Sequence, residues 1–317
     1  MLIDQQCLQY LQQASTVAIF THMRPDGDCL GTGLALKLML EAQGKKVDIY
    51  GDVNISENYQ FLPGIDAVNQ PTLSSYDLTV AVDCSDRYRL GDWWRVYEGG
   101  TYTLKIDHHA TNDQFAQVNV VHTVGSTAEI MYYVFQQLGW ELNSDVATCL
   151  YAGLSSDTGC FLYNSTTKET HEIACDLMSY HLDLEKIHYY LFQRRTRQQI
   201  MLTATALYNI EFALEGKVAF TGLSLKDFHR IGVKSTETIG IVSMMSNIDG
   251  CRISILMGEE KPNVFAVSFR TDGSVDVAKV AEQFGGGGHK MAAGCKLYGS
   301  FNTVKEKLLK GCEPFIC

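Results

Sequence analysis

Short apolar segments alternate with longer helical segments through the first half of the chain. Segments typical of strands occupy residues 16–20, 45–51, 76–83 and 102–107. Segments typical of helices occupy residues 31–44, 126–139 and 143–157. Gly44 and Gly139 are expected to end the first two helices, and Asn143 or Ser144 to cap the third. Repeated alternation of this kind predicts an α/β fold, with a parallel sheet and helices on both of its faces.

The second half of the chain has a different pattern. Residues 169–210 are mainly helical, and the apolar periodicity weakens over residues 192–199. Beyond them, residues 216–224, 251–259 and 263–271 are typical of strands, and residues 276–284 of a short amphipathic helix. We predict a domain over residues 1–190, a helical linker over 191–200 and a smaller α+β domain over 201–317. The active-site cleft is expected between the two domains.

The charge of the chain limits its partners. Its 317 residues include 36 acidic and 26 basic ones, which gives a formal net charge of −10. Binding of a long duplex nucleic acid usually needs a basic face, so this balance argues against such a partner. An anionic substrate would need local positive charge, from a few Arg or Lys residues or from metal ions.

Cysteine usage and the N-terminal sequence indicate a cytoplasmic protein. The ten cysteines form no C-x-x-C pair and no disulfide framework. The first residues, MLIDQQCLQYLQQ, are typical of a polar helix rather than of a signal peptide. No run approaches the ~20 apolar residues that a membrane span needs. We therefore expect a reduced, cytoplasmic protein with free thiols and no membrane partner.

Aspartate and histidine gather directly after apolar segments. Four stretches share this feature, and their polar residues are His22, Asp26 and Asp28, then Asp83, then Asp107, His108 and His109, and finally Asp157. In open parallel α/β sheets, binding sites form beyond the carboxyl ends of the strands. We expect residues from the four stretches to meet there in one crevice.

Several carboxylates in one crevice repel one another and stay ionised only when cations neutralise them. One divalent ion could not use so many ligands, whereas two ions that share a bridging carboxylate could. Mixed oxygen and imidazole ligands suit Mn²⁺, with Mg²⁺, Fe²⁺ and Co²⁺ as competitors. Two such ions ~3.5–4 Å apart recur in phosphoryl transfer, where they activate a shared water for in-line attack on phosphorus. The pattern predicts a site of this kind.

Each of these residues also has an ordinary structural explanation. A single aspartate after a strand is commonly a turn former or a helix cap, and Asp28 could be such a cap. Asp86 and Asp113 are better explained as caps than as ligands. The remaining histidines lack a comparable context and are expected at the surface or in the core: His122, His171, His181, His188 and His229. Only the joint occurrence of the four stretches favours a metal site.

A glycine-rich segment, FGGGGHKMAAG, occupies residues 284–294. It follows a helix rather than a strand, which distinguishes it from a dinucleotide-binding motif. Glycines let backbone N–H groups converge on an anion, and His289 and Arg270 could add donors to a phosphate. The alternative is a flexible loop beside a C-terminal helix. Paired with a metal site, the segment favours a nucleotide as the ligand.

Taken together, these stretches resemble a known family. THMRPDGDCLG, VAVDCSDRYRLG, KIDHHATN and LSSDTGCFLYNST look like the four successive motifs of the DHH phosphoesterases. The stretch VSFRTDGSVDVAKVAEQFGGGGHKMAAG resembles the DHHA1 domain that accompanies them. The resemblance covers nearly the whole chain, and its size and two-domain layout are most similar to the NrnA-type branch of oligoribonucleases and pAp phosphatases.

The resemblance implies roles for individual residues. One Mn²⁺ ion would be held by His22, Asp26 and Asp83, and a second by Asp28, Asp83, His108 and Asp157, so that Asp83 bridges them. Asp107 would orient an imidazole from behind the ligands, and His109 would stabilise the charge of the scissile phosphate. The terminal nucleotide would be held by Arg270 and by Gly286, Gly287, Gly288 and His289. No expected ligand position is substituted.

The resemblance also implies an activity. The enzyme would hydrolyse short oligonucleotides to nucleoside 5′-monophosphates by a two-metal activated hydroxide, and would dephosphorylate 3′-phosphoadenosine 5′-phosphate (pAp). Its partners would be short single-stranded RNA or DNA oligonucleotides, dinucleotides and pAp, with a second copy in a homodimer as in many relatives. One alternative is a phosphodiesterase specialised for linear or cyclic dinucleotides, and another is a nucleotide-binding sensor without turnover.

Overall fold

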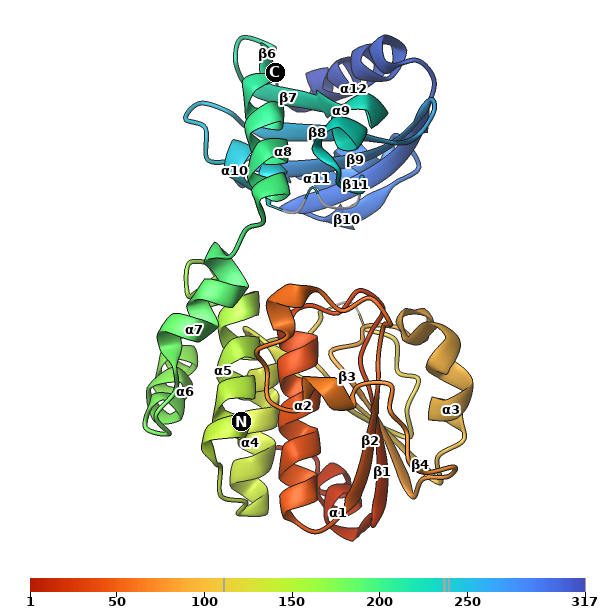
Figure 1. The fold of residues 1–317 in the computed structure, drawn as a ribbon, viewed down its shortest axis with the longest axis vertical. Coiled ribbons are helices and arrows are strands. Elements are labelled where there is room, and N and C mark those ends of the chain that lie inside the picture. Colours follow the sequence, from red (N-terminus) through yellow and green to blue (C-terminus); the bar gives the residue numbers. More distant parts are fainter. Residues whose placement is uncertain (111, 236–237, 239, 317) are drawn as a thin grey trace. The chain divides into compact units, whose positions relative to one another are not determined.

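The structure is a computed structural model that describes residues 1–110, 112–235, 238 and 240–316. The chain divides into two compact units, Met1–Arg194 and Arg195–Cys317, each with its own sheet and hydrophobic core (Figure 1). The first unit is built on a parallel sheet, and the smaller second unit on a mixed sheet. The predicted fold class is confirmed.

All five strands of the first sheet are parallel and lie in the order β2-β1-β3-β4-β5. Their bounds are Thr16–Phe20 (β1), Lys46–Tyr50 (β2), Leu78–Val82 (β3), Tyr102–Asp107 (β4) and Val118–Val121 (β5). The first four confirm the predicted strands. The sequence pattern missed β5, because four residues of alternating burial make too short a signal. The register aligns the carboxyl ends of the central strands, since Phe20 pairs with Ala81 and Val82 pairs with Ile106.

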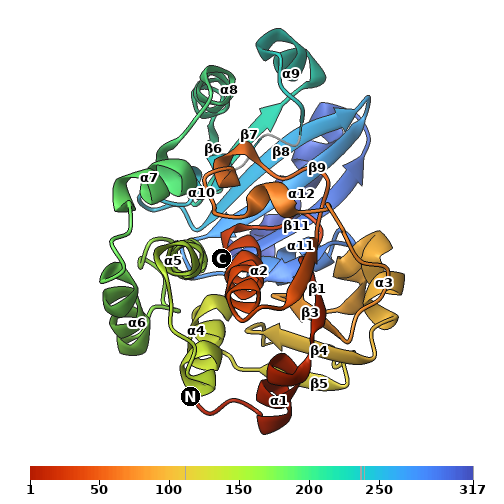
Figure 2. The ribbon, with the colours of Figure 1, turned by 60° about the horizontal axis from the view of Figure 1, so that its bottom comes forward.

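Helices cover both faces of this sheet (Figures 1 and 2). One face packs against α1 (Gln5–Gln13), α2 (Gly27–Ala42), α4 (Thr127–Leu138) and α5 (Ser144–Asp157), and the other against η3 (Arg87–Trp93) and α3 (Trp94–Glu98). Successive strand residues point to opposite faces, so Ile19 enters the first core and Phe20 the second. The unit also contains η1 (Glu57–Tyr59), η2 (Ile65–Ala67), α6 (Lys168–Met178), α7 (Leu184–His188) and the π-helical turn η4 (Tyr189–Gln193).

The ends of these helices follow local side-chain chemistry. Gly139 ends α4 and Asn143 caps α5, as predicted. The predicted start of α2 at residue 31 is wrong, because the helix begins at Gly27. The Asp26 carboxylate accepts a hydrogen bond of 3.0 Å from the Cys29 amide and caps the helix there. The cap is therefore Asp26, which leaves Asp28 in the first turn.

Glycines let α2 and α5 approach each other closely. A Cβ atom on Gly31 would lie 2.4 Å from the Cys149 carbonyl oxygen and 2.9 Å from the Gly153 nitrogen. A Cβ atom on Gly153 would lie 2.8 Å from Oδ1 of Asp28. These distances are too short for real carbon atoms, so neither position accepts a larger residue at the present separation of the helices.

We expect Gly31→Ala to lower the free energy of unfolding. Overpacking of a close contact typically destabilises by about 1–3 kcal/mol, and alanine recovers only about 1 kcal/mol through its helix propensity. Urea unfolding followed by circular dichroism measures the change. Gly99→Ala is the matched control, because the nearest atom to a Cβ at Gly99 would lie 3.4 Å away, an ordinary contact. Equal stability of the two variants would contradict the packing argument.

The second unit has a six-stranded sheet in the order β10-β11-β9-β8-β7-β6. The strands are Glu211–Ala213 (β6), Val218–Leu223 (β7), Ile253–Lys261 (β8), Val264–Thr271 (β9), Gly287–His289 (β10) and Ala292–Tyr298 (β11). One core lies between the sheet and α8 (Arg197–Tyr208), α9 (Leu225–Ile231) and α10 (Ile241–Met245). The other lies between the sheet and α11 (Val277–Glu282) and α12 (Phe301–Ile316).

The alternative interpretation of the glycine-rich segment, a flexible loop, is wrong. Gly287–His289 forms the edge strand β10, which pairs antiparallel with β11. A Cβ atom on Gly286 would lie 2.1 Å from the Gly294 carbonyl oxygen, and Gly288 has a φ of +148°. Glycine therefore permits this tight hairpin, which is why a run that weakens ordinary strands forms one here.

Two further sequence expectations concern thiols and membranes. The nine cysteines within the described residues are all free thiols, as predicted. Cys317 lies outside the described residues. Among the helices that the structure describes, none combines the length and the apolar character needed to cross a membrane.

Candidate metal centre

The aligned strand ends of the first sheet bring predicted site residues to one edge. His22 lies two residues after β1, Asp83 directly follows β3, and Asp107 is the last residue of β4. Because these strands are neighbours, their carboxyl ends lie side by side. The Asp83 amide donates a 2.9 Å hydrogen bond to the Ile106 carbonyl, which extends the strand pairing up to the site.

Two helix ends bring further carboxylates to this edge. Asp26 and Asp28 lie at the start of α2, and Asp157 is the last residue of α5. The glycine contact between α2 and α5 holds these two helices together. The predicted ligands of the first unit therefore converge: His22, Asp26, Asp28, Asp83, His108 and Asp157.

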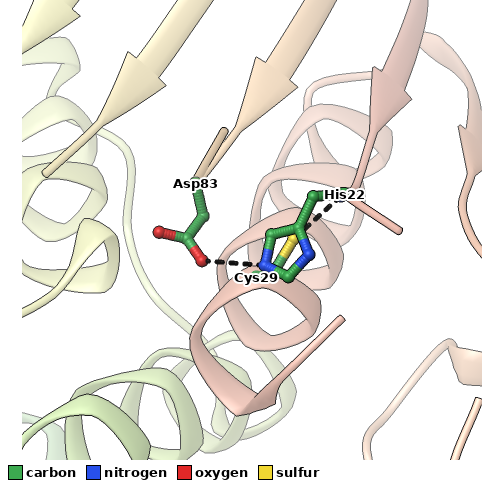
Figure 3. Close-up of side chains that lie close together, drawn as sticks. All are labelled: His22, Cys29 and Asp83. Atoms are coloured by element: carbon green, nitrogen blue, oxygen red, sulfur yellow. Dashed lines mark hydrogen bonds and ion pairs between the residues drawn. The ribbon is translucent and has the colours of Figure 1, made fainter. Parts of the chain in front are cut away.

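Asp83 lies between two imidazole rings. Its Oδ2 atom is 3.5 Å from Nε2 of His22, and its Oδ1 atom is 3.5 Å from Nε2 of His108. Figure 3 shows the Asp83 carboxylate pointing from its strand end toward His22, with Cys29 of α2 beside the ring. Asp83 has a φ of +56°, in the left-handed region that disfavours most side chains. Backbone strain of this kind is typical of functional positions.

The other ligand atoms lie close to this pair. One oxygen of Asp28, one nitrogen of His108 and one oxygen of Asp157 lie within 4.8 Å of one another, with His108 Nε2 and Asp157 Oδ2 3.1 Å apart. Asp26 Oδ2 lies 3.9 Å from His22 Nε2. Since metal–ligand distances are about 2.0–2.6 Å, atoms spaced in this way can share a cation.

Backbone carbonyls orient both histidines toward the centre. Nδ1 of His22 lies 2.9 Å from the Met23 carbonyl oxygen, and Nδ1 of His108 lies 3.0 Å from the Val124 carbonyl oxygen. A carbonyl can only accept, so each Nδ1 carries a proton, and either ring in its neutral form presents a lone pair at Nε2. This is the tautomer that a metal-binding histidine requires.

Three buried polar atoms of the centre have no hydrogen-bond partner among the described residues. Four buried side-chain nitrogen or oxygen atoms in the described residues have no hydrogen bond, and three lie here: His22 Nε2, Asp83 Oδ2 and His108 Nε2. Buried polar groups are almost always satisfied, so three such atoms facing one another require an explanation. Bound divalent cations would satisfy all three. The residues present therefore fit metal ions with carboxylate and imidazole ligands.

Burial and mutual repulsion perturb the ionisation of these groups. Burial, and then the charge of Asp157, raise the pKa of Asp28 to about 7. Burial, and then the charge of Asp28, raise the pKa of Asp83 well above its ordinary value. Burial acts to lower the pKa of His108, but Asp157, Asp28 and Asp83 outweigh it and raise this pKa to about 10. The raised pKa values mean that protons on these three side chains compete with cations for the centre.

We expect the affinity for Mn²⁺ to fall about tenfold or more for each pH unit between pH 8 and pH 6. With a pKa of about 10 His108 holds a proton throughout this range, and with a pKa of about 7 Asp28 gains one in its lower half, so a cation must displace them. Lower pH therefore strengthens the competitor and weakens metal binding. Titration calorimetry at pH 6, 7 and 8, in buffers of different ionisation enthalpy, measures both the affinity and the number of protons released. An affinity independent of pH would contradict this linkage.

Asp107 is not among these ligand groups and instead holds His109. Its Oδ1 atom accepts a 2.7 Å hydrogen bond from Nδ1 of His109, and Oδ2 accepts one from the side-chain amide of Asn112. Burial acts to raise the pKa of Asp107, but the bonds from His109 outweigh it and lower this pKa. Lys105, buried beneath, donates to Asn112 and lies 4.7 Å from the Phe115 ring centre. The network fixes the His109 ring 3.7 Å from Asp83 Oδ1.

Sequence reasoning missed two groups that support the ligands. The amides of Thr127 and Ala128, at the start of α4, donate to the two oxygens of Asp28 at 2.6 and 2.9 Å, and Thr127 Oγ1 donates to Asp83 at 2.9 Å. In the sequence, Ser126 indicates that a helix starts there, but it does not indicate which carboxylate the first amides of that helix bind. The N-terminus of α4 thus holds Asp28 in place.

Cys29 is the second missed group. Its buried Sγ atom accepts a 3.2 Å hydrogen bond from the His22 amide and lies 3.6 Å from the Val82 carbonyl oxygen, to which the thiol donates. Burial raises the pKa of the Cys29 thiol well above its ordinary value. A neutral thiol with both contacts in use positions His22 rather than binding a cation. No sequence pattern distinguished it from the other cysteines.

The predicted substrate-binding residues lie together in the second unit. His289 and Arg270 both pair with Ala292, from opposite sides of β11, so their side chains share one face of the sheet about 10 Å apart. The hairpin geometry explains the glycines at 286 and 288. It does not explain Gly287, where an added Cβ atom would meet nothing within 4 Å.

Most of the residues expected to have ordinary roles have them. Asp86 caps η3 by accepting hydrogen bonds from the amides of Tyr88 and Arg89, as predicted. The prediction that Asp113 is a cap is wrong, because Asp113 lies in a loop, where its amide donates a 2.7 Å hydrogen bond to the Ser85 carbonyl. The five other histidines are exposed or partly buried and belong to none of the metal-ligand groups found among the described residues: His122, His171, His181, His188 and His229.

Two family models match the chain. The model described as "DHH family, N-terminal domain" matches residues 16–154, and the model described as "DHHA1 domain" matches residues 217–313. The first match contains all the predicted ligands except Asp157, and the second contains the glycine-rich hairpin.

Individual relatives agree with these matches. A Streptococcus mutans protein named "probable bifunctional oligoribonuclease and PAP phosphatase NrnA" is 30% identical over 303 residues, which cover 92% of each chain. A Bacillus subtilis protein named "bifunctional oligoribonuclease and PAP phosphatase NrnA" is 27% identical over 287 residues, or 89% of this chain and 90% of that one. The crystal structure of an exopolyphosphatase-related protein from Bacteroides fragilis has the same fold, with a TM-score of 0.91 and 23% identity over 99% of this chain and 98% of that one.

Proposed function

The chain belongs to the DHH family and carries its DHHA1 domain, and on this premise we propose that it hydrolyses short oligonucleotides to nucleoside 5′-monophosphates and converts pAp to AMP. It is a hydrolase that acts on phosphoester bonds. One observation carries the proposal: the two oxygens of Asp83 face two different imidazoles, His22 and His108, whose Nε2 atoms have no hydrogen-bond partner. The family relationship favours turnover over a non-hydrolytic sensor.

We assign one cation to His22, Asp26 and Asp83, and a second to Asp28, Asp83, His108 and Asp157. When bound, two Mn²⁺ ions, or Mg²⁺, Co²⁺ or Fe²⁺ in their place, would acidify a water and neutralise the charge of the phosphate. The chain supplies the rest of the arrangement. The N-terminus of α4 fixes Asp28, and the Met23 and Val124 carbonyls fix the two imidazoles.

His109 and Asp107 act on the phosphate without binding a cation in this proposal. Asp107 accepts a hydrogen bond from Nδ1 of His109, which fixes the orientation of the ring. With Nδ1 engaged in this way, the ring donates from Nε2 to a phosphate oxygen when both of its nitrogens carry a proton, and so stabilises the charge that develops there. Asn112 donates to the Asp107 carboxylate and is itself held by Lys105, so the carboxylate keeps its position.

We assign substrate holding to residues 201–317, catalysis to residues 1–190 and the helical linker to residues 191–200. Arg270 and His289 share one sheet face and can both donate to a terminal phosphate or ribose. Gly287 supports this role, because no packing contact explains its missing side chain, while an exposed backbone amide could approach a nucleotide closely.

We expect His289→Ala to raise KM for oligonucleotides about tenfold and to leave kcat within threefold. The residue holds the nucleotide in this proposal and does not take part in bond cleavage, so its loss weakens binding. Steady-state kinetics with a dinucleotide measure both constants. His229→Ala is the control, since His229 is an exposed histidine of the same unit. An unchanged KM with a collapsed kcat would contradict the assignment.

A substrate panel tests the proposed function directly. Pure protein with Mn²⁺, and separately with Mg²⁺, is incubated with labelled di- to pentanucleotides, pAp, linear and cyclic dinucleotides and pyrophosphate. We expect mononucleotide release from the short oligonucleotides and AMP from pAp. Activity confined to dinucleotides would indicate the specialised phosphodiesterase, and the absence of mononucleotide and AMP would refute the proposal.

The cellular setting follows from the same features. Free thiols throughout the described residues support a reducing, cytoplasmic location. A formal net charge of −10 favours short single-stranded substrates, which need few phosphate contacts, over long duplexes. A homodimer is part of the proposal by analogy with relatives, and light scattering tests it.

A further inference from the structure

The segment that follows Asp83 forms a hollow on the surface of the first unit. Arg87, Tyr88, Gly91 and Trp94 line it, and its volume is about 500 Å³. Sites that bind small molecules typically have volumes of about 300–1,000 Å³. We call this feature the η3 hollow, since three of its four residues belong to η3 and Trp94 begins α3.

The η3 hollow combines an arginine with two aromatic rings. The Arg87 guanidinium lies 5.0 Å from the centre of the Tyr88 ring and 5.9 Å from that of Trp94. Tyr88 is 71% exposed, so its ring is accessible to a ligand. Trp94 is held from within by Tyr97 and Phe115, at ring distances of 5.5 and 5.8 Å. The Arg87 guanidinium thus lies near one ring that its neighbours hold in place, Trp94, and one ring that is exposed, Tyr88.

Arg87 forms no ion pair with a carboxylate of the described residues, and its guanidinium donates a 3.2 Å hydrogen bond to the Tyr88 hydroxyl. Among the described residues, no aspartate or glutamate lies within 4.0 Å of its guanidinium. The adjacent Asp86 instead accepts two backbone hydrogen bonds, which hold η3 in shape. In a chain with a net charge of −10, an exposed arginine without an acidic partner points to an anionic ligand.

The η3 hollow adjoins the metal centre through Met23, the residue after His22. The Met23 amide donates a 2.7 Å hydrogen bond to the Arg89 carbonyl of η3. The Met23 side chain also packs on the hollow itself, since a Cβ atom on Gly91 would lie 2.8 Å from its Sδ atom. A chain of nucleotides with a phosphate at the metal centre therefore has the η3 hollow within reach.

We propose that the η3 hollow holds the nucleotide that adjoins the scissile phosphate of a single-stranded oligonucleotide. Its base would stack on Tyr88 and its phosphate would pair with Arg87. Aromatic rings interleaved with arginine are how proteins bind single strands without reading their sequence. The inference rests on the proposed function, and it explains how an acidic protein would distinguish an oligonucleotide from pAp, which has no second nucleoside.

Binding of a probe that cannot be cleaved tests the η3 hollow. A fluorescein-labelled trinucleotide with phosphorothioate linkages is titrated with protein in Mn²⁺, and anisotropy gives Kd. We expect Tyr88→Ala and Arg87→Ala each to weaken binding roughly 5- to 100-fold, as loss of a stacked base or a phosphate contact does. Tyr88→Phe should stay within twofold because the ring remains. Arg95→Ala, at an exposed arginine of α3, should bind like the unaltered protein.

Kinetics on two substrates separate this inference from the proposed function. The loss of kcat/KM in Tyr88→Ala should be at least fivefold greater for the trinucleotide than for pAp. Equal losses, an unchanged Kd, or no binding of the trinucleotide by the unaltered protein would each overturn the η3 hollow as a subsite. If the unaltered protein binds the probe through Tyr88 but cleaves neither substrate, the subsite stands and the proposed function fails.

Discussion

Replacing Asp83 by asparagine is expected to lower kcat for every phosphoester substrate by about 1,000-fold or more. The two oxygens of Asp83 face the imidazoles of His22 and His108, so its loss removes a shared ligand from both proposed cations. Calorimetric titration with Mn²⁺ should show fewer than two bound ions per chain. Retention of two ions, or of more than a tenth of the activity, would contradict the bridging role.

Asparagine is the substitution that separates chemistry from folding. It tolerates the left-handed φ of +56° at this position and keeps an oxygen to accept the hydrogen bond from Thr127 Oγ1. It also removes a buried carboxyl whose pKa burial raises well above its ordinary value. The free energy of unfolding in EDTA should therefore be unchanged or higher than that of the unaltered protein. Asp83→Ala would lose both the hydrogen bond and the backbone preference, so it is the poorer test.

Asp157→Ala and His108→Ala should each lower kcat by about 100- to 1,000-fold and leave one bound Mn²⁺ per chain. The two side chains approach to 3.1 Å and belong to the proposed second cation, whereas His22 and Asp26 belong to the first. Titration calorimetry and turnover of a dinucleotide measure the two effects. Asp145→Ala is the matched control, an exposed aspartate in the first turn of the same helix.

The pair of variants also tests whether the two cations act together. The double variant should be no slower than the slower single variant, since both changes empty the same position. If the loss of kcat in the double variant equalled the product of the two single losses, His108 and Asp157 would act independently, which would contradict the ligand assignment.

Much of the fold and of the site could be predicted because the signals were local and repeated. Apolar segments bounded by glycine or polar residues predicted β1, β2, β3 and β4, and Asp or His at successive strand ends predicted that they would meet. That inference needed only the rule that parallel strands share one carboxyl edge. Six candidate ligands therefore converge in the structure as the sequence suggested.

The rest depended on contacts between distant residues. Nothing near Asp28 in the sequence indicates that the amides of Thr127 and Ala128 hold its carboxylate. Cys29 resembles the other cysteines until its neighbour His22 is seen to donate to it. The sequence does not predict the hairpin of β10 and β11, because glycine disfavours strands in isolation and only the pairing with β11 overrides that preference.

The glycine contact between α2 and α5 has a consequence for how reactivity could be tuned. Asp28 and Asp157 stand on these two helices, and Gly31 and Gly153 determine how near the helices come. The distance between the two carboxylates thus depends on how closely the two helix backbones pack, and not only on the side-chain conformations. A substitution at this contact such as Gly31→Ala, whose added Cβ atom would first meet main-chain atoms of α5, would widen that gap while every ligand atom stays chemically identical. The protein therefore offers a means of measuring how cleavage rate depends on ligand spacing alone.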